Sequence, residues 1–248
     1  MYPQERREEI LAILEQHQYV TVAYLMERLR YSSATINRDL NALEKRQLVR
    51  RSYGGVELEE SRAVPLVFRQ HKQHHAKECI AQRAAAFVED GDVLFIDGST
   101  TAQHMGRYLA EKERLTVITN NITLAASLSD RGIECVVLGG RIVEQPSMTG
   151  GVDTVDMARR YRVSKVFFST GSVADDGTIG SGDLYYELLR VMIHHADKAY
   201  FLIDKEKLNN RGHKVLCDFG AVDAVISDYD FSALAAIYPE TQLIQVTV

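Results

Sequence analysis

A carboxylate, a glycine and three hydroxyl groups follow one another where an apolar run of the sequence ends. They are Asp97, Gly98, Ser99, Thr100 and Thr101. The glycine permits a tight turn after a buried strand, and the hydroxyl residues can cap a helix that follows them. Hydroxyl groups beside the free N–H groups of a helix start can bind an anion such as a phosphate. A plain helix cap without a ligand is the alternative interpretation of this segment.

Further apolar runs also end in amide or glycine residues. These residues are Thr119, Asn120 and Asn121 after one run, Gly139 and Gly140 after another, and Gly150 beyond a polar segment. Amide side chains suit sugar hydroxyls or phosphate oxygens, and paired glycines let the backbone approach a ligand closely. Because ligands bind beyond the carboxyl ends of parallel strands, these residues together predict a site for a hydroxylated, anionic molecule.

A polar helix face near the N-terminus suggests a different chemistry. At 100° per residue, Ile36, Leu40 and Leu43 share one face of a helix that begins near residue 33. The other face carries side chains that can bond to base edges or phosphates in a DNA groove. The candidate DNA contacts of this helix and of the segment after it are Ser33, Thr35, Asn37, Arg38, Asn41, Lys45, Arg50, Arg51 and Tyr53. A helical protein-interaction domain with a solvated face is the alternative.

The elements that would position these side chains form a winged helix-turn-helix over residues 1–57. Helical patterns cover residues 4–17, a second segment that Thr21 can cap, and a third from residue 32 or 33. The short connection at residues 31–32 is typical of a helix-turn-helix. Residues 47–58 predict two short strands around Gly54 and Gly55, which would form the wing.

The charge distribution favours phosphate contact in the same region, although the whole chain has a net charge of −5. Residues 1–56 hold 9 Lys and Arg against 7 Asp and Glu, whereas the remaining residues hold 20 against 27. Seven of the basic residues lie between positions 28 and 51. Local charge rather than the overall balance decides contact with a nucleic acid.

Beyond residue 75 the sequence predicts an α/β domain with a mostly parallel sheet covered on both faces. Apolar runs at residues 93–97, 115–120, 134–140, 165–173, 199–204, 223–228 and 243–248 alternate with helical patterns at 101–111, 122–130, 185–196 and 231–238. A linker is expected over residues 58–75, because its early part is acidic and contains Pro65. A helix is expected from about Phe68 to Glu89, and the domain itself over residues 76–248.

No metal or cofactor is expected from the sequence. His71 and His75 have helical spacing, and His74 lies beside them, but a solvated helix face is the preferred interpretation because a further ligand at the usual spacing is missing. Cys79, Cys135 and Cys217 are far apart, which suits reduced thiols. With 46% apolar residues, no apolar run of the roughly 20 residues that span a bilayer and no secretory pattern at the start, a cytoplasmic protein without membrane contact is expected.

Residues 33–55 closely resemble the helix-turn-helix signature of the DeoR family of bacterial transcriptional regulators. The matching positions are Ser33, Thr35, Ile36, Arg38, Asp39, Leu40, Leu43, Glu44, Arg51, Gly54 and Gly55. Asn37 stands where the family usually has Arg, which removes one charged contact and can alter the base preference. The resemblance implies sequence-specific binding to a double-stranded DNA operator, on the bacterial nucleoid.

The later sequence is similar to the effector domain of the same family, which resembles ribose-5-phosphate isomerase in fold. Residues 97–101 match Asp-Ser-Gly-Thr-Thr with two residues exchanged, and Asp204 and Lys207 match the ends of an Asp-Ser-Ser-Lys motif. Glu187 matches a Glu typical of its helix. The resemblance covers about residues 6–228 and implies a phosphorylated sugar as effector. Lys207 would then face the ligand, with Lys205 as the competing candidate.

The resemblance implies a repressor of carbohydrate-metabolism genes that works as a homodimer or homotetramer. The effector would bind one arrangement of the oligomer better and so change the operator affinity. The alternative is a phosphosugar isomerase or deaminase that carries a DNA-binding module, since fold alone does not determine function. Asp97, Asp183, Glu187 and Lys207 would supply its acid–base groups. An enzyme has no need of a basic winged helix-turn-helix, so the regulator is preferred.

Overall fold

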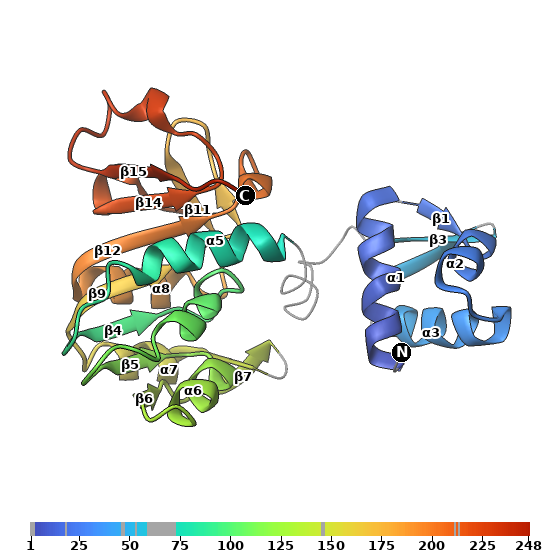
Figure 1. The fold of residues 1–248 in the computed structure, drawn as a ribbon, viewed down its shortest axis with the longest axis horizontal. Coiled ribbons are helices and arrows are strands. Elements are labelled where there is room, and N and C mark those ends of the chain that lie inside the picture. Colours follow the sequence, from blue (N-terminus) through green and yellow to red (C-terminus); the bar gives the residue numbers. More distant parts are fainter. Residues whose placement is uncertain are drawn as a thin grey trace. The chain divides into compact units, whose positions relative to one another are not determined.

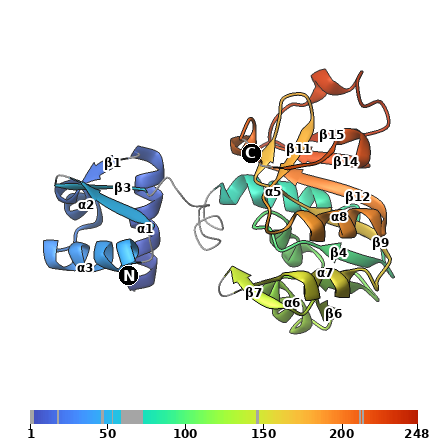
Figure 2. The ribbon, with the colours of Figure 1, turned by 180° about the vertical axis from the view of Figure 1, so that it is seen from behind.

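The chain divides into two units, residues 1–72 and residues 73–248 (Figures 1 and 2). The computed structural model describes residues 3–17, 19–45, 48–52, 54–58, 73–144, 147–210, 212 and 214–248. Each unit has its own buried apolar core. Most of the expected linker, including the expected helix start at Phe68, lies outside the described residues. Helix α5 begins at His74, so residues 74 and 75 of that expected linker are helical.

The first unit is a winged helix-turn-helix, as the sequence predicts. Its helices are α1 (Pro3–His17), α2 (Val22–Leu29) and α3 (Ser33–Lys45). Strands β1 (Tyr19–Thr21), β2 (Val49–Ser52) and β3 (Gly55–Leu58) form an antiparallel sheet in the order β1-β3-β2. The Thr21 hydroxyl caps α2 by accepting a hydrogen bond from the Tyr24 backbone N–H at 3.1 Å. Strands β2 and β3 are the predicted wing, whereas β1 was not predicted.

The core of the first unit confirms the predicted inner face of α3. Ile36, Leu40 and Leu43 are buried and pack in one cluster with Leu14 of α1 and Leu25 of α2. The polar side of α3 therefore remains outside this core. Burial of these apolar side chains contributes more to the stability of so short a helix than the helix propensity of its residues does.

The second unit contains a seven-stranded parallel sheet, which the repeated apolar runs predict. Its order is β15-β14-β12-β9-β4-β5-β6. The strands are β4 (Val93–Ile96), β5 (Thr116–Thr119), β6 (Glu134–Val137), β9 (Val163–Phe168), β12 (Ala196–Ile203), β14 (Ala224–Ser227) and β15 (Gln242–Gln245). All six neighbouring pairs are parallel, so the carboxyl ends of these strands lie at one edge.

Helices cover both faces of this sheet, and each face has its own apolar cluster (Figures 1 and 2). On one face, α5 (His74–Ala85), the 3-10 helix η1 (Ala102–Tyr108) and α6 (Ile122–Ser129) pack against residues such as Leu94 and Ile96. On the other face, α7 (Val152–Ala158) and α8 (Tyr186–His194) pack against Phe95 and Phe168. Coverage on both faces explains why the strands are apolar throughout.

Several smaller elements differ from the sequence prediction. Strands β10 (Ser172–Val173), β11 (Thr178–Ser181) and β13 (Lys214–Asp218) form an antiparallel sheet, and β7 (Arg141–Glu144) pairs with β8 (Met148–Gly150). Short 3-10 helices η2 (Lys205–Lys207), η3 (Phe219–Ala221) and η4 (Ser232–Leu234) follow β12, β13 and β14. The expected helix at 101–111 is the 3-10 helix η1. Gly106, a poor helix former, lies in its middle and packs closely on Leu124.

Among the described residues, no helix is both long and apolar enough to cross a membrane.

Candidate functional site

The outer face of α3 presents polar side chains to solvent. Ser33, Arg38, Asn41 and Lys45 are exposed, and Thr35 is half-buried. The backbone N–H of Thr35 donates to the Ser32 hydroxyl at 3.4 Å, which caps the helix start. Exposed Arg and Asn side chains on one helix face can pair with purine edges in a major groove. The structure therefore brings together the α3 residues that the sequence assigns to DNA contact.

Asn37 connects this helix to the wing. Its side-chain amide donates to the Ser33 backbone oxygen at 2.9 Å, and its Oδ1 accepts a hydrogen bond from the Arg51 guanidinium. Arg50, on the same strand, pairs with Glu57 across the wing at 2.9 Å. Tyr53 lies outside the described residues. The departure from the usual Arg at position 37 thus changes an internal contact as well as the surface charge.

Asp39 holds α3 against α1, a role that its sequence context does not reveal. Its carboxylate is fully buried and accepts from Arg6 Nε at 2.5 Å and from Arg7 Nε at 2.9 Å. The hydrogen bond to Asp39 raises the pKa of Arg6, so the guanidinium remains charged. Arg6 also lies over the Tyr31 ring, 4.6 Å from its centroid. This buried ion pair fixes the orientation of α3.

A second polar site lies at the carboxyl edge of the large sheet, and Lys207 is at its centre. Lys207 Nζ lies 3.2 Å from Asp204 Oδ2, 3.1 Å from Ser169 Oγ and 3.3 Å from Thr101 Oγ1. These partners follow β12, β9 and β4, which are neighbours in the sheet. We name Asp97, Ser99, Thr101, Ser169, Asp204 and Lys207 the Lys207 cluster. Lys205 is exposed and lies 3.8 Å from Asp228 instead.

Besides Asp204, a second carboxyl group of the cluster, that of Asp97, faces Lys207. Its carboxyl is buried, and Oδ1 accepts a hydrogen bond from the Ser99 hydroxyl at 2.6 Å. Burial raises the pKa of Asp97 to about 7, against the lowering effects of the Ser99 hydrogen bonds and the Lys207 charge. Near neutral pH the carboxyl can therefore donate or accept a proton without a large energetic cost.

Asn120 and Gly98 form a close-packed corner beside the cluster. Asn120 Nδ2 donates to the Thr149 backbone oxygen at 3.0 Å, whereas its buried Oδ1 has no hydrogen-bond partner among the described residues. A Cβ atom at position 98 would lie 3.1 Å from this Oδ1 and would also collide with Met148. A buried acceptor without a donor is costly, so a ligand hydroxyl is a suitable partner for it.

Other residues that the sequence assigns to the same site make contacts within the protein. Thr119 Oγ1 accepts from the Asn121 backbone, and Asn121 Oδ1 caps α6 through the Leu124 N–H, each at 3.0 Å. Thr154 donates to the Gly139 oxygen at 2.7 Å and fills the space beside Gly140, whose φ is +142°. Gly150 packs against Val143. Thr100 is buried in the loop before η1.

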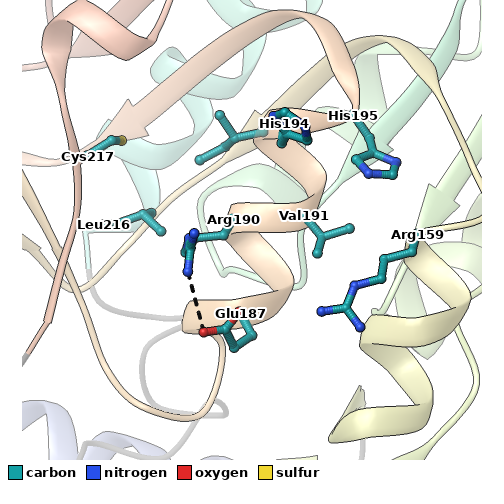
Figure 3. Close-up of a pocket in the computed structure, with 9 residues that line it drawn as sticks. Arg159, Glu187, Arg190, Val191, His194, His195, Leu216 and Cys217 are labelled. Carbon is teal, nitrogen blue, oxygen red and sulfur yellow. Dashed lines mark ion pairs between the residues drawn. The ribbon is translucent and has the colours of Figure 1, made fainter.

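Glu187 lies in a separate pocket between α7, α8 and β13 (Figure 3). Its carboxylate is 3.7 Å from Arg190 on the same helix, and Arg159, which follows α7, also lines the pocket. The Lys207 cluster contributes no residue to the lining of this pocket. Asp183, an acid–base candidate of the enzyme hypothesis, is exposed and pairs with Lys214 at 3.1 Å.

Two family models match the sequence in the order of the two units. The DeoR-like helix-turn-helix domain matches residues 6–62, and the DeoR C-terminal sensor domain matches residues 72–229. The chain belongs to the DeoR family. It is a DNA-binding transcriptional regulator rather than an enzyme, which confirms the resemblance in the sequence and sets the isomerase hypothesis aside.

Curated relatives of this DeoR-family regulator match it over nearly its whole length. The HTH-type transcriptional repressor GlcR of Bacillus subtilis is 30% identical over 237 residues, which are 92% of this chain and 89% of the relative. The glycerol-3-phosphate regulon repressor of Escherichia coli is 28% identical over 228 residues, or 90% of each chain. Among solved structures, ribose 5-phosphate isomerase A of Methanocaldococcus jannaschii is 19% identical, with a TM-score of 0.41 over 55% of each chain.

Ser169 is a member of the cluster in this DeoR-family regulator that sequence reasoning missed. The apolar run that includes β9 was extended to residue 173, so its polar end was counted as strand. Asp204 was matched to a family motif but was not assigned to the site. The abrupt change from Phe168 to Ser169 and Thr170 was the signal that marks the end of β9.

Proposed function

We propose that this DeoR-family protein is a repressor of carbohydrate-metabolism genes whose operator affinity changes when a phosphorylated sugar occupies the Lys207 cluster. One of its relatives is the glycerol-3-phosphate regulon repressor of Escherichia coli, and the family model that matches its second unit is a sensor domain. We also propose that it acts on the bacterial nucleoid in the cytoplasm, where a regulator of this kind would bind its operator.

The observation that carries the proposal is the position of Lys207. Its ammonium group contacts the hydroxyl groups of Thr101 and Ser169 and the Asp204 carboxylate. A phosphate group would add a further anion to this ammonium, while the hydroxyl groups would donate to phosphate oxygens. The Asp97 carboxyl and the Asn120 amide oxygen would accept hydrogen bonds from sugar hydroxyls.

Effector binding in the second unit would change DNA binding by the first unit through the arrangement of subunits in an oligomer. We propose a homodimer or homotetramer in which two α3 helices contact half-sites about 34 Å apart, one turn of DNA. An effector that binds one arrangement of the oligomer better shifts the operator affinity by the ratio of its two affinities. A coupling of about 1–3 kcal/mol corresponds to a 5–150-fold change.

The test measures effector and operator binding in the same preparations. Purified protein is titrated into a labelled fragment of its own promoter, followed by fluorescence anisotropy, with and without phosphorylated sugars. The same sugars are screened by thermal shift. We expect at least one of them to raise the melting temperature and to change the operator affinity at least fivefold, while its unphosphorylated form does neither.

The matched variants are Lys207→Ala and Lys205→Ala, which remove neighbouring lysines of the same 3-10 helix. We expect Lys207→Ala to abolish the effector response and to leave operator affinity without effector unchanged. Lys205→Ala should respond like the wild type. An equal response of both variants would place the effector elsewhere, and an absence of preference for the promoter over random duplex would refute the regulatory role.

A further inference from the structure

Three side chains that can bind a metal ion converge where helix α5 begins. His74 and Glu78 lie one turn apart on α5, and His104 lies on η1. One donor atom of each residue lies within 4.8 Å of the donor atoms of the other two. Within this group, His74 Nδ1 is 3.5 Å from Glu78 Oε2. The sequence interpretation, in which no Cys or carboxylate has the expected spacing from the histidines, overlooks Glu78 four residues after His74, and His104 is distant in the sequence.

His104 gives the strongest indication of a ligand, because one of its ring nitrogens is buried without a hydrogen-bond partner among the described residues. Its exposed fraction is 8%, and its Nε2 is buried without a hydrogen-bond partner among the described residues. The His104 ring meets the His74 ring edge-on, with centroids 4.9 Å apart. A buried polar atom without a partner is costly, and bound ions are a recognised explanation for such atoms.

The Glu78 carboxylate is shared between η1 and His74. The Arg107 guanidinium binds Glu78 Oε1, which leaves Oε2 directed to His74.

We propose that His74, Glu78 and His104 form a site for a divalent transition-metal ion of the Zn²⁺ class. Two imidazoles and one carboxylate, with a fourth position open to water, are a common ligand set for this ion. Ligand atoms about 2.0 Å from a tetrahedral ion lie roughly 3.3 Å apart. The donor atoms would therefore move closer by rotation of the side chains of His74 and Glu78, which are 45% and 25% exposed.

An ion at this position would tie the first turn of α5 to η1. Gln73 precedes α5 but does not cap it, since its side chain donates to Glu206. Helix η1 begins directly after Thr101, which contacts Lys207. The ion would therefore connect the start of the sensor domain to the helix that follows Thr101 of the Lys207 cluster.

The experiment uses the full chain, stripped of metal with a chelator and then titrated with Zn²⁺ against a chromophoric competitor. We expect one equivalent of Zn²⁺ to bind with micromolar or stronger affinity and to raise the melting temperature. His74→Ala and Glu78→Gln should each weaken binding at least tenfold. Co²⁺ should give the strong visible absorption of a four-coordinate site in the wild type and lose it in both variants.

The matched controls separate this site from incidental binding. His75→Ala removes the exposed neighbour of His74, and Cys79→Ser removes the nearby thiol; both should bind like the wild type. Because His104 is buried and its variant can lose stability, the decision depends on the more accessible ligands, His74 and Glu78. Wild-type affinity in both ligand variants, or the absence of a stoichiometric site in the wild type, would overturn the proposal.

Discussion

At the scale of single residues, the two proposed recognition events depend on cations in opposite surroundings. Arg38 is exposed on α3, where its guanidinium can reach a base or a phosphate. Lys207 is mostly enclosed by hydroxyl groups and Asp204, where a single added anion changes its environment strongly. In the proposed function, the first cation would contribute specificity for DNA, and the second would contribute sensitivity to a ligand.

Replacement of Arg38 distinguishes base contact from phosphate contact. We expect Arg38→Ala to weaken operator binding by roughly 1–3 kcal/mol, because a bidentate contact to a base is lost. Arg38→Lys keeps the charge but not the planar fork, so it should recover nonspecific binding without recovering the preference for the operator. Anisotropy titrations with operator and random duplexes measure both quantities. Unchanged operator affinity in Arg38→Ala would contradict the assignment.

The raised pKa of Asp97 predicts a pH-dependent stability. A group whose pKa is higher in the folded state contributes stability at low pH that is lost as the pH rises through the folded value. For Asp97 this loss falls between about pH 4 and 7. Asp97→Asn cannot ionise, so its stability relative to the wild type should improve by about 2–4 kcal/mol from pH 4 to pH 8.

Urea unfolding of both proteins at the two pH values, followed by circular dichroism, measures this difference. Other titrating groups, including His104, are common to both proteins and cancel in the comparison. A difference that stays constant with pH would show that Asp97 keeps its ordinary pKa in the folded protein.

At the scale of secondary-structure elements, α3 owes its orientation to contacts on both sides. Asp39 binds Arg6 and Arg7 of α1 on the inner side, and Asn37 binds Arg51 of the wing on the outer side. The helix proposed to contact DNA is thus held by an ion pair and by a hydrogen bond to a separate strand. Removal of either contact should affect DNA binding without a change in the exposed side chains.

Removal of the Asp39 carboxylate should destabilise the first unit. We expect Asp39→Ala to lower its free energy of unfolding by about 3–5 kcal/mol, because the buried Arg6 loses its partner. Glu44→Ala, an exposed acid on the same helix, is the control and should change the stability by less than about 0.5 kcal/mol. Urea unfolding of a fragment of residues 1–58 measures both values. Equal stability of the two variants would refute the structural role of Asp39.

Some elements of the fold could be predicted from the sequence, and others could not. The large strands were predictable because burial on both faces leaves long apolar runs, and α3 because Ile36, Leu40 and Leu43 share one face. The sheet order was not predictable, so the contact of Ser169 with Lys207 was not either. Asp39 resembles a solvated acid until Arg6 is placed beside it. Short elements such as β7 and η1 depend on tertiary packing rather than on a periodic pattern.

At the scale of the whole molecule, the two units have separate cores and should be separable. We expect a fragment of residues 73–248 to fold on its own and to bind the phosphorylated sugar with an affinity close to that of the full chain. It should not bind the operator, because it lacks α3 and the excess of basic residues. Calorimetry with the fragment and the full chain tests this. Loss of sugar binding in a folded fragment would show that the first unit completes the site.

The hydrogen bond between Asn37 and Arg51 has a consequence for attempts to redirect this regulator to new promoters. Exchange of the recognition helix alone for that of a relative would usually replace Asn37 by an arginine, which cannot accept the hydrogen bond that Arg51 donates here. This contact between helix and wing would then be lost. Helix and wing should therefore be transplanted as one module, and substitutions at positions 37 and 51 should show strong epistasis.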